Sequence, residues 1–331
     1  INKTIDLKSF LAERCRIRRT SDVYNFEILK NNSMEMIVNL QRINDIRRIN
    51  FYLRAVNGKL LPGGVFVGCV LPNIQRFDRI IEKYPGGIGH FVYLFDFIWR
   101  RVFIKMPVIR HFYFWVTKGK DRAISLAETL GRLVFNGFEI INLSIIGDDF
   151  YFIAKKSAPP IEDSTPKYRL VFKMRRVGLN GNPITVYKIR TMHPYSEYIQ
   201  KFLYEQSNLD VGGKFKNDFR ITSWGKVLRK LWIDELPMLL NLFRGELKLV
   251  GVRPLSSHYL SLYSESFREY RNRFKPGLLP PYYADMPETI DEIEQSEKAY
   301  LTSYEKSPLI TDIRYFFKAF FNIIIRRKRS A

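Results

Sequence analysis

The sequence predicts an α/β protein of two domains, and three observations carry that prediction. The chain has 331 residues, roughly twice the length of a typical domain. Its 46% apolar and 15% aromatic residues are ample for buried cores, which excludes a disordered chain. Three prolines within 157–166 oppose both helix and central strand, so we expect a linker there between domains 1–156 and 167–331.

The first domain is predicted to be a layer of strands and helices, because apolar runs of strand length alternate with helical spacing. The expected elements, in chain order, are a strand at 35–40, a helix within 41–60, a turn at 61–64, a strand at 65–70, a helix at 126–134 and strands at 137–142 and 150–155. The last two strands are separated by Gly147-Asp-Asp and are expected to pair antiparallel.

Two stretches of this domain, "LLPGGVFVGC" and "GFEIINLSIIGDDFYFIAKK", resemble the C-terminal half of a Rossmann-like S-adenosylmethionine methyltransferase over about residues 35–155. The resemblance implies a partial Rossmann-like domain. The first strand and Gly-rich turn that hold the cofactor in that family are absent, and the glycines at 86–89 are expected to form an ordinary turn. We therefore expect a degenerate or truncated domain without methyltransferase activity. Since the chain starts at Ile1 rather than Met, we expect an N-terminal piece to be missing.

Two segments have the composition of membrane-interface helices. Residues 91–116 are rich in aromatic side chains and carry four basic ones, and Pro107 is expected to kink the helix. A kinked lid helix over the first domain is the alternative. The aromatic, apolar stretch 316–325 leads into the basic cluster 326–329, which is typical of a helix lying in the interface, with ordinary core packing as the alternative. No apolar run reaches spanning length, so no spanning helix is expected.

The net charge of +21 predicts an anionic partner. Both halves are basic, with 25 Lys+Arg against 14 Asp+Glu in 1–157 and 29 against 19 in 158–331. The arginine-rich run 14–19 is either part of this binding charge or a solvated face. No recognised nucleic-acid-binding module is present, so we expect anionic lipid or phosphorylated substrates rather than nucleic acid. Two cysteines exclude a disulfide scaffold.

The second half contains residues suited to phosphate chemistry. Residues 184–192 alternate like a strand, and Lys188 and Arg190 would lie on one face, where they can clasp an anion. Pro237 is best tolerated in the first turn of a helix, which places Asp234 and Glu235 at a helix N-terminus and Gly245 at its C-cap. There the helix dipole is expected to lower the carboxyl pKa values. An ionised Asp234 beside Mg²⁺ can attack a phosphoryl group, whereas simple N-capping is the alternative.

Three blocks together carry a more specific resemblance: "VGLNGNPITVYKIRTM", "DFRITSWGKVLRKLWIDELPMLLNLFRGELKLVGVRP" and "RFKPG". In order and spacing they closely resemble the bacterial sugar transferases known as monotopic phosphoglycosyl transferases, over about residues 168–280. The resemblance implies a small α/β catalytic domain with interfacial helices at the cytoplasmic face of the bacterial inner membrane. It also implies transfer of a phospho-sugar from a nucleotide diphosphate sugar, usually a UDP-sugar, to polyprenyl phosphate, which initiates surface glycan synthesis.

The resemblance assigns roles to individual residues. Asp234 is the nucleophile that forms a covalent phospho-sugar intermediate and releases UMP, and Asp234 and Glu235 lie by the Mg²⁺. The basic residues at the matching positions would bind substrate phosphates: Lys188, Arg190, Arg220, Arg229 and Arg253. Phosphoryl transfer depends mostly on positioning and charge neutralisation, so cations and a metal matter more than a histidine base.

The sequence departs from the family pattern at two places. Val252 stands where the family commonly has a proline, and Leu278–Asp285 replaces the usual Ile-Thr-Gly-like continuation. The hydrophobic re-entrant helix that normally precedes the catalytic block is also replaced by a polar, proline-containing stretch at 158–174. An inactive relative that binds lipid or nucleotide sugar is therefore an alternative to the active transferase, and a methyltransferase is a more remote one.

Overall fold

The computed structural model describes residues 10–162, 166, 168–206 and 218–325. They form two compact units. The first unit comprises residues 1–166 together with 193–206, and the second comprises residues 167–192 together with 207–331. The sequence places 193–206 in the second domain, whereas in the structure this short segment belongs to the first unit.

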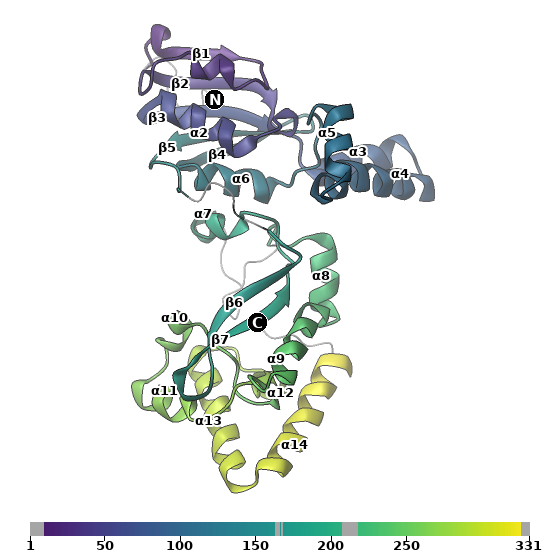
Figure 1. The fold of residues 1–331 in the computed structure, drawn as a ribbon, viewed down its shortest axis with the longest axis vertical. Helices are drawn as coiled ribbons and strands as arrows, with labels where there is room; N and C mark the ends of the chain where they lie inside the picture. The colour runs from purple at the N-terminus through teal and green to yellow at the C-terminus, as the bar shows by residue number, and fades with distance from the viewer. Residues whose placement is uncertain (1–9, 163–165, 167, 207–217, 326–331) are drawn as a thin grey trace. The chain divides into compact units, whose positions relative to one another are not determined.

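The first unit is an α/β layer built on a five-stranded sheet in the order β1-β2-β3-β5-β4 (Figure 1). The strands are β1 (Cys15–Arg18), β2 (Met34–Arg42), β3 (Leu60–Val70), β4 (Phe138–Ile146) and β5 (Asp149–Lys156). Strands β1, β2 and β3 are parallel, and β5 pairs antiparallel with both β3 and β4. The expected strands and the closing antiparallel pair are confirmed. The expected turn at 61–64 lies within β3 as a bulge, since Leu60 pairs with Met34 and Val65 with Met36.

Helices α1 (Tyr24–Glu27), α2 (Ile49–Lys59) and α6 (Leu126–Phe135) accompany this sheet. Their apolar side chains form the core with one sheet face, and Tyr52 of α2 lies edge-on to Phe26, with 5.4 Å between ring centroids. Phe66 and Phe152 extend the same aromatic cluster from β3 and β5, 5.5 Å apart. The helix expected within 41–60 is therefore shorter, because a 3-10 turn at Ile43–Asp45 precedes it.

The segment 193–206 completes the core of the first unit. It forms a 3-10 turn, Ser196–Ile199, and helix α7 (Gln200–Gln206). Tyr195 has a left-handed backbone conformation, and its ring lies 5.2 Å from that of Phe135. The approach is so close that a Cβ on Gly131 would lie 2.1 Å from the Tyr195 carbonyl oxygen, so only glycine fits in α6 at that point.

The segment 91–116 is helical and interrupted. Helix α3 (Asn73–Lys83) packs against α4 (Gly87–Phe97), and a π-helical turn (Ile98–Val102) and a 3-10 turn (Phe103–Lys105) lead to α5 (Ile109–Thr117) (Figure 1). The break falls at Met106 and Pro107, as expected for the proline. None of the helices in the described part of the chain is long and apolar enough to cross a membrane.

The second unit begins with a two-stranded hairpin, β6 (Val171–Val177) and β7 (Pro183–Ile189). Helices α8 (Ser223–Lys230) and α9 (Leu239–Phe243) flank a 3-10 helix, Ile233–Met238. The predicted strand and the predicted helical stretch between Asp234 and Gly245 are confirmed, although β7 ends before Arg190.

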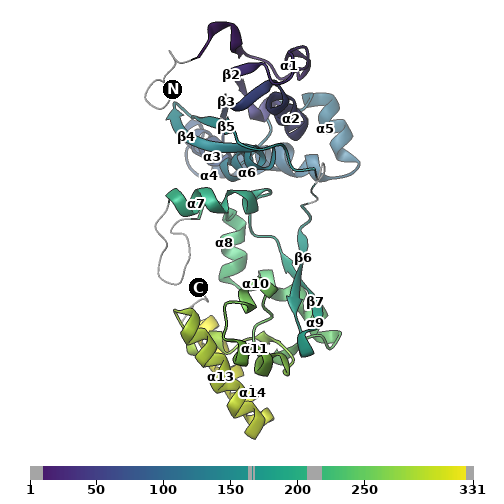
Figure 2. The same ribbon diagram turned by 90° about the vertical axis from the view of Figure 1, so that its left-hand side faces the viewer.

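The rest of the second unit is mainly helical around a short parallel pair, β8 (Lys248–Val250) and β9 (Gly277–Leu279). Its helices are α10 (Ser257–Leu260), α11 (Glu265–Asn272), α12 (Tyr282–Asp285), α13 (Ile290–Lys306) and α14 (Pro308–Phe320). Helix α13 leads directly into α14, and the two form a hairpin that is open to view in Figure 1 and overlaps in projection in Figure 2. A capping box at Thr289 and Glu292 begins α13. The basic cluster 326–329 lies outside the described residues.

Candidate functional site

The β6–β7 hairpin presents one face to a pocket. Arg176 pairs with Ile184 across the hairpin, and Met174 pairs with Val186, so these side chains share a face with Lys188. Val186 is buried with Met174 and Ile184 against Met238, which fixes this face against the 3-10 helix. The hairpin therefore holds two cations, Arg176 and Lys188, at the rim of a small core.

The Asp234-Glu235 pair lies in the first turn of the Ile233–Met238 helix, as predicted, but Pro237 lies inside this 3-10 helix and not in its first turn. Gly245, at a φ of +71°, follows α9, which confirms the expected glycine cap. The residue before the turn is Trp232, in a left-handed conformation, and no side chain caps the helix. Asp234 is therefore not an N-cap. Glu235 is buried, and its Oε1 accepts a hydrogen bond from Lys188 Nζ at 2.5 Å.

Asp234 differs electrostatically from the expectation. Burial raises its pKa above the ordinary aspartate value, and repulsion by Glu235 raises it further, whereas Lys188 and Arg229 lower it. The predicted lowering of its pKa is wrong, because desolvation and the adjacent carboxylate outweigh the dipole of a short helix. The fold thus holds two acidic groups together at a cost, which is typical of functional carboxylates.

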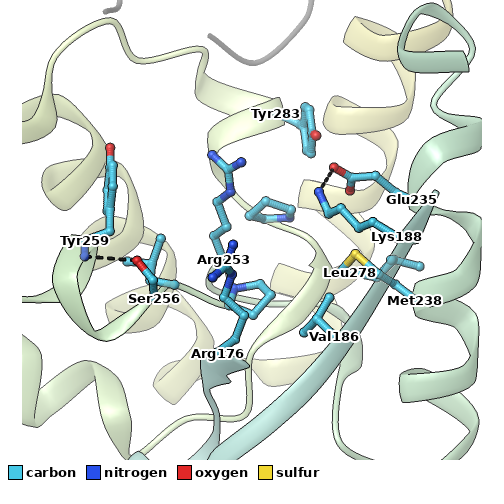
Figure 3. Close-up of a pocket in the computed structure, with 13 residues that line it drawn as sticks. Arg176, Val186, Lys188, Glu235, Met238, Arg253, Ser256, Tyr259, Leu278 and Tyr283 are labelled. Carbon is cyan, nitrogen blue, oxygen red and sulfur yellow. Dashed lines mark hydrogen bonds and ion pairs between the residues drawn. The ribbon is translucent and has the colours of Figure 1, made fainter. Parts of the chain in front are cut away.

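Next to Glu235 is a pocket of about 150 Å³ (Figure 3), and Glu235 lines it whereas Asp234 does not. Three cationic side chains line it: Arg176, Lys188 and Arg253. The other lining residues are Val186, Glu235, Met238, Pro254, Leu255, Ser256, Tyr259, Leu278, Pro280 and Tyr283. Burial and the nearby Arg253 guanidinium lower the pKa of Arg176. Such concentrated positive charge is suited to an anion with more than one phosphate.

The loop that carries Arg253 is held from behind by a buried ion pair. Oε2 of Glu297 in α13 accepts a hydrogen bond from Arg271 Nε at 2.6 Å, and Oε1 accepts one from the backbone N–H of Arg253 at 3.0 Å. Arg271 also donates to the Arg253 carbonyl oxygen. With its backbone fixed, Arg253 extends into the pocket with its guanidinium 5.5 Å from the Tyr282 ring centroid.

Arg229 approaches the carboxylate pair from α8. Its Nε donates to Thr191 Oγ1 at 2.9 Å, and Thr222 donates through both N–H and Oγ1 to the Thr191 carbonyl. Helix α8 lies so close to this segment that a Cβ on Gly225 would be 2.2 Å from the Thr191 oxygen. Thr191 therefore sets the position of Arg229 next to Asp234.

Three of the predicted phosphate ligands do not line the pocket: Arg190, Arg220 and Arg229. Arg190 stacks on Tyr168 and Phe172, with its guanidinium 5.0 Å from each ring centroid. Because β7 ends at Ile189, Arg190 no longer shares the orientation of Lys188, and the expected clasp by these two cations is not formed. Arg220 is buried in an ion pair with Asp218 at 2.7 Å.

The carboxylate pair also meets the requirements of a shared magnesium site. Among the described residues there is no group of three or more His, Cys, Asp or Glu side chains arranged to hold a metal. Mg²⁺, however, is commonly bound by one or two carboxylates together with substrate phosphates. Asp234 and Glu235 are two adjacent carboxylates; burial first and then repulsion by Glu235 raise the pKa of Asp234, and a divalent cation would relieve that repulsion. The residues present thus fit Mg²⁺ held jointly with a phosphorylated substrate.

Comparison with known proteins identifies the family. The family model for bacterial sugar transferases matches residues 158–326, more than half of the chain. The chain belongs to the bacterial sugar transferase family. An uncharacterized sugar transferase of Bacillus subtilis is 42% identical over 107 residues, which are 32% of this chain and 46% of the relative. The UDP-glucose:undecaprenyl-phosphate glucose-1-phosphate transferase of Caulobacter vibrioides is 38% identical over 110 residues, 33% of this chain and 38% of that protein.

This bacterial sugar transferase thus spans less than half the length of those curated relatives. Among solved structures, an S-adenosylmethionine-dependent methyltransferase of Thermotoga maritima is similar at a TM-score of 0.25 and 13% identity, covering 39% of this chain and 59% of that one. A similarity at that level supports no inference about cofactor or activity.

Both departures from the family pattern lie at or near the pocket of this sugar transferase. Val252 is fully buried in the core beneath the Arg253 loop. Leu278, Pro280 and Tyr283 of the altered segment line the pocket itself, and Tyr283 Oη accepts a hydrogen bond from Trp232 Nε1 at 3.3 Å. The altered residues therefore change the wall of the site and leave its cations in place.

Arg176, Ser256, Tyr259 and Tyr283 line the site but were not among the residues selected from the sequence. Arg176 had a usable signal, because a hairpin turn after Gly178 sets it opposite Ile184 on the Lys188 face. Ser256 precedes α10 and Tyr259 lies within it, after the loop that follows Pro254. The spacing of these residues in the sequence gives no sign of a pocket formed with distant parts of the chain.

Proposed function

We propose that this protein transfers a sugar 1-phosphate from a nucleoside diphosphate sugar, most simply a UDP-sugar, to polyprenyl phosphate and so initiates a bacterial surface glycan. The observation that carries the proposal is the juxtaposition of a strained carboxylate pair, Asp234 and Glu235, with a pocket lined by Arg176, Lys188 and Arg253. Cations at the rim accept a diphosphate, and the adjacent carboxylate supplies a nucleophile.

In the first step, an Asp234 carboxylate oxygen attacks the phosphorus that bears the sugar. A new bond forms between that oxygen and phosphorus while the bond from phosphorus to the bridging oxygen breaks. UMP leaves with the bonding electron pair, and the phospho-sugar stays on Asp234. No proton has to move, since every reacting oxygen is already anionic. The reaction therefore needs cations to neutralise charge and needs no general base. His193 is accordingly not required: it is buried in the first unit, and burial and Arg101 lower its pKa to about 4.

In the second step, an oxygen of polyprenyl phosphate attacks the same phosphorus. The bond from phosphorus to Asp234 breaks, the free carboxylate is restored, and a polyprenyl diphosphate sugar is released. Arg176 and Arg253 bind the incoming phosphates, and Arg229 stabilises the charge that returns to Asp234. Lys188 holds Glu235 in place between the two steps. When bound by Asp234 and Glu235, Mg²⁺ supplies further neutralisation of the diphosphate charge.

The raised pKa of Asp234 serves this cycle. A carboxylate destabilised by burial and by Glu235 is a more basic nucleophile than an exposed one, and bonding to phosphorus relieves its repulsion. Lys188 and Arg229 act in the opposite direction and lower its pKa.

We also propose that the protein works at the cytoplasmic face of the inner membrane, where its polyprenyl acceptor lies. Helix α14 supports this location, because Ile310, Ile313 and Phe317 form an exposed apolar stripe at helical spacing. For the first unit, we propose a degenerate Rossmann-like domain, in keeping with its parallel β1, β2 and β3 and its closing antiparallel pair. Failure to bind S-adenosylmethionine in calorimetry is the expected result.

The experiment uses the whole protein with Mg²⁺, polyprenyl phosphate and a panel of UDP-sugars, and it measures UMP release and radiolabel transferred from the sugar to the protein. Asp234→Asn is expected to abolish both signals. Asp291→Asn, on the exposed first turn of α13, is the control and is expected to retain them. If Asp234→Asn still transfers sugar phosphate to lipid, the covalent mechanism is wrong. If no donor gives UMP with the wild-type protein, the transferase assignment for UDP-sugars fails.

A further inference from the structure

Helices α4 and α5 of the first unit are apolar on two opposite sides. On the inner side, Tyr93 of α4 packs edge-on against Phe77 of α3, with ring centroids 4.8 Å apart, and Tyr113 of α5 is fully buried. A helix that is apolar on one side only would now meet water with polar residues. These two helices expose large apolar residues as well as polar ones such as Arg110 and His111, so the exposed apolar residues need an explanation.

The outer side is a continuous set of large, exposed apolar side chains, which we call the α4–α5 surface. Its members are Ile88 (66% exposed), Phe91 (67%), Phe95 (69%), Val108 (83%), Phe112 (55%) and Trp115 (76%). In each helix they recur every three or four residues and therefore lie on one stripe. Trp99 lies one turn beyond Phe95, and its ring is 6.4 Å from that of Phe112, so the two stripes meet.

The charge around this surface is almost entirely positive. Residues 87–120 contain six Lys+Arg and one acidic residue, Asp96, but Arg100 and Arg101 are ion-paired with Asp96, Asp121 and Glu128 and so do not add to the outer charge. Asp96 points inward and is ion-paired with Arg76 at 2.6 Å and with Arg100 at 2.8 Å, so it does not offset the outer charge. Arg110 of α5 and Lys118, just beyond it, are exposed. Exposed aromatic rings bordered by cations match the boundary of an anionic bilayer, where rings enter the acyl edge and cations meet lipid phosphates.

We propose that the α4–α5 surface docks the first unit on an anionic lipid leaflet. Phe91, Phe95, Phe112 and Trp115 enter the leaflet to the depth of the headgroup boundary, and the exposed Lys118 at the end of α5 contacts the phosphates. The break at Met106 and Pro107 lets the two stripes follow the leaflet as separate short helices. This role goes beyond sugar transfer, since it needs neither the carboxylate pair nor a nucleotide sugar.

The first test is flotation of the whole protein with vesicles of phosphatidylglycerol, compared with phosphatidylcholine vesicles. The triple variant Phe91→Ser, Phe95→Ser and Phe112→Ser is expected to lower the partition coefficient on phosphatidylglycerol at least about tenfold. The matched control replaces three exposed apolar residues of α1, its C-terminal flank and α2, namely Tyr24→Ser, Ile28→Ser and Phe51→Ser, and is expected to bind like the wild type. Circular dichroism and thermal unfolding check that both variants fold.

The second test reads this surface directly and separates it from membrane binding by the second unit. Lipids brominated near the headgroup quench tryptophans that enter the leaflet, and Trp115→Phe is expected to remove a measurable share of the quenching. Equal partitioning of the two triple variants, or unchanged quenching in Trp115→Phe, overturns the proposal. A third outcome also overturns the proposal. If the wild type is a dimer and the Phe91, Phe95 and Phe112 replacements convert it to a monomer that still binds vesicles, a second copy of the chain covers this surface. None of these readouts depends on UMP release, so loss of the transferase assignment leaves the test intact.

Discussion

The ion pair behind the Arg253 loop offers a sharp test of how this site is built. Replacing Glu297 by glutamine keeps the size of the side chain and an oxygen for the backbone N–H of Arg253, but it removes the charge that faces Arg271. The side chains of Glu297 and Arg271 are 1% and 2% exposed, so water cannot compensate the loss. Arg271 is left as an unpaired, buried cation.

The expected cost follows from that burial. Removing one partner of a buried ion pair destabilises a protein by about 3–5 kcal/mol. At about 2–4 °C per kcal/mol for a domain of this size, the melting temperature of the second unit should fall by roughly 6–20 °C. Since the same carboxylate positions Arg253, the Michaelis constant for the sugar nucleotide should rise as well, measured at a temperature where the variant remains folded.

The assay is differential scanning calorimetry of the whole protein, followed by steady-state kinetics of UMP release. Glu305→Gln is the control, because Glu305 lies on the same helix, is exposed and only accepts a hydrogen bond from Tyr270. Its unfolding free energy should change by no more than about 0.5 kcal/mol. If Glu297→Gln melts together with Glu305→Gln, the buried pair does not hold the loop and the reasoning fails.

Three further changes test other parts of the molecule. Burial raises the pKa of Asp234 in the folded state, so its ionised form opposes folding at pH values above the unfolded pKa. Asp234→Asn should therefore raise the melting temperature at pH 7, and the gain should shrink as the pH is lowered. Thermal melts followed by fluorescence at each pH check this. Burial opposes ionisation of Glu128, but Arg101 and Arg132 dominate and hold its pKa well below its usual range. The stability that this carboxylate contributes at pH 7 is therefore lost as the pH falls below the pKa of Glu128 in the unfolded state. Glu128→Gln should lower the free energy of unfolding by about 3–5 kcal/mol at pH 7 and by less at acid pH, as measured by urea titration. Gly225→Ala should lower the free energy of unfolding by about 1–3 kcal/mol and lower kcat/KM, because it displaces α8 from Thr191. Gly58→Ala is the control: a Cβ there meets no atom, and stability in the same urea titration should change by less than about 1 kcal/mol. Equal effects of the two variants would contradict the close approach of α8 to the Thr191 carbonyl.

Local signals in the sequence predicted the elements that local physics controls. Pro237 and Gly245 correctly located the beginning and end of a helical stretch, because each residue restricts the backbone by itself. Strand β1 was not predicted, since its residues Cys15–Arg18 are arginine-rich and lack a strand pattern. It forms because β2 offers a parallel edge at Met36–Asn39, which only the tertiary structure reveals.

The candidate site divides in the same way. The place of Asp234 and Glu235 at a helix start follows from a local pattern, whereas the role predicted for them comes from the family resemblance. The direction of the Asp234 pKa depends on burial and was predicted wrongly. Lys188 and Arg253 come together in the pocket, whereas Arg190 turns onto aromatic rings where the strand ends. Contacts between residues far apart, such as Arg271 with Glu297, leave no periodic trace in the sequence.

The placement of 193–206 in the first unit has a consequence for how the chain is made. Emerging from the ribosome, the first 166 residues lack Tyr195 and Ile199, which fill their core beside Phe135. The β6–β7 hairpin of the second unit is therefore synthesised before the first unit can close. A cut at the proline-rich stretch would separate the first unit from Tyr195 and leave a cavity beside Gly131, so the boundary of the first unit does not coincide with a single point in the chain.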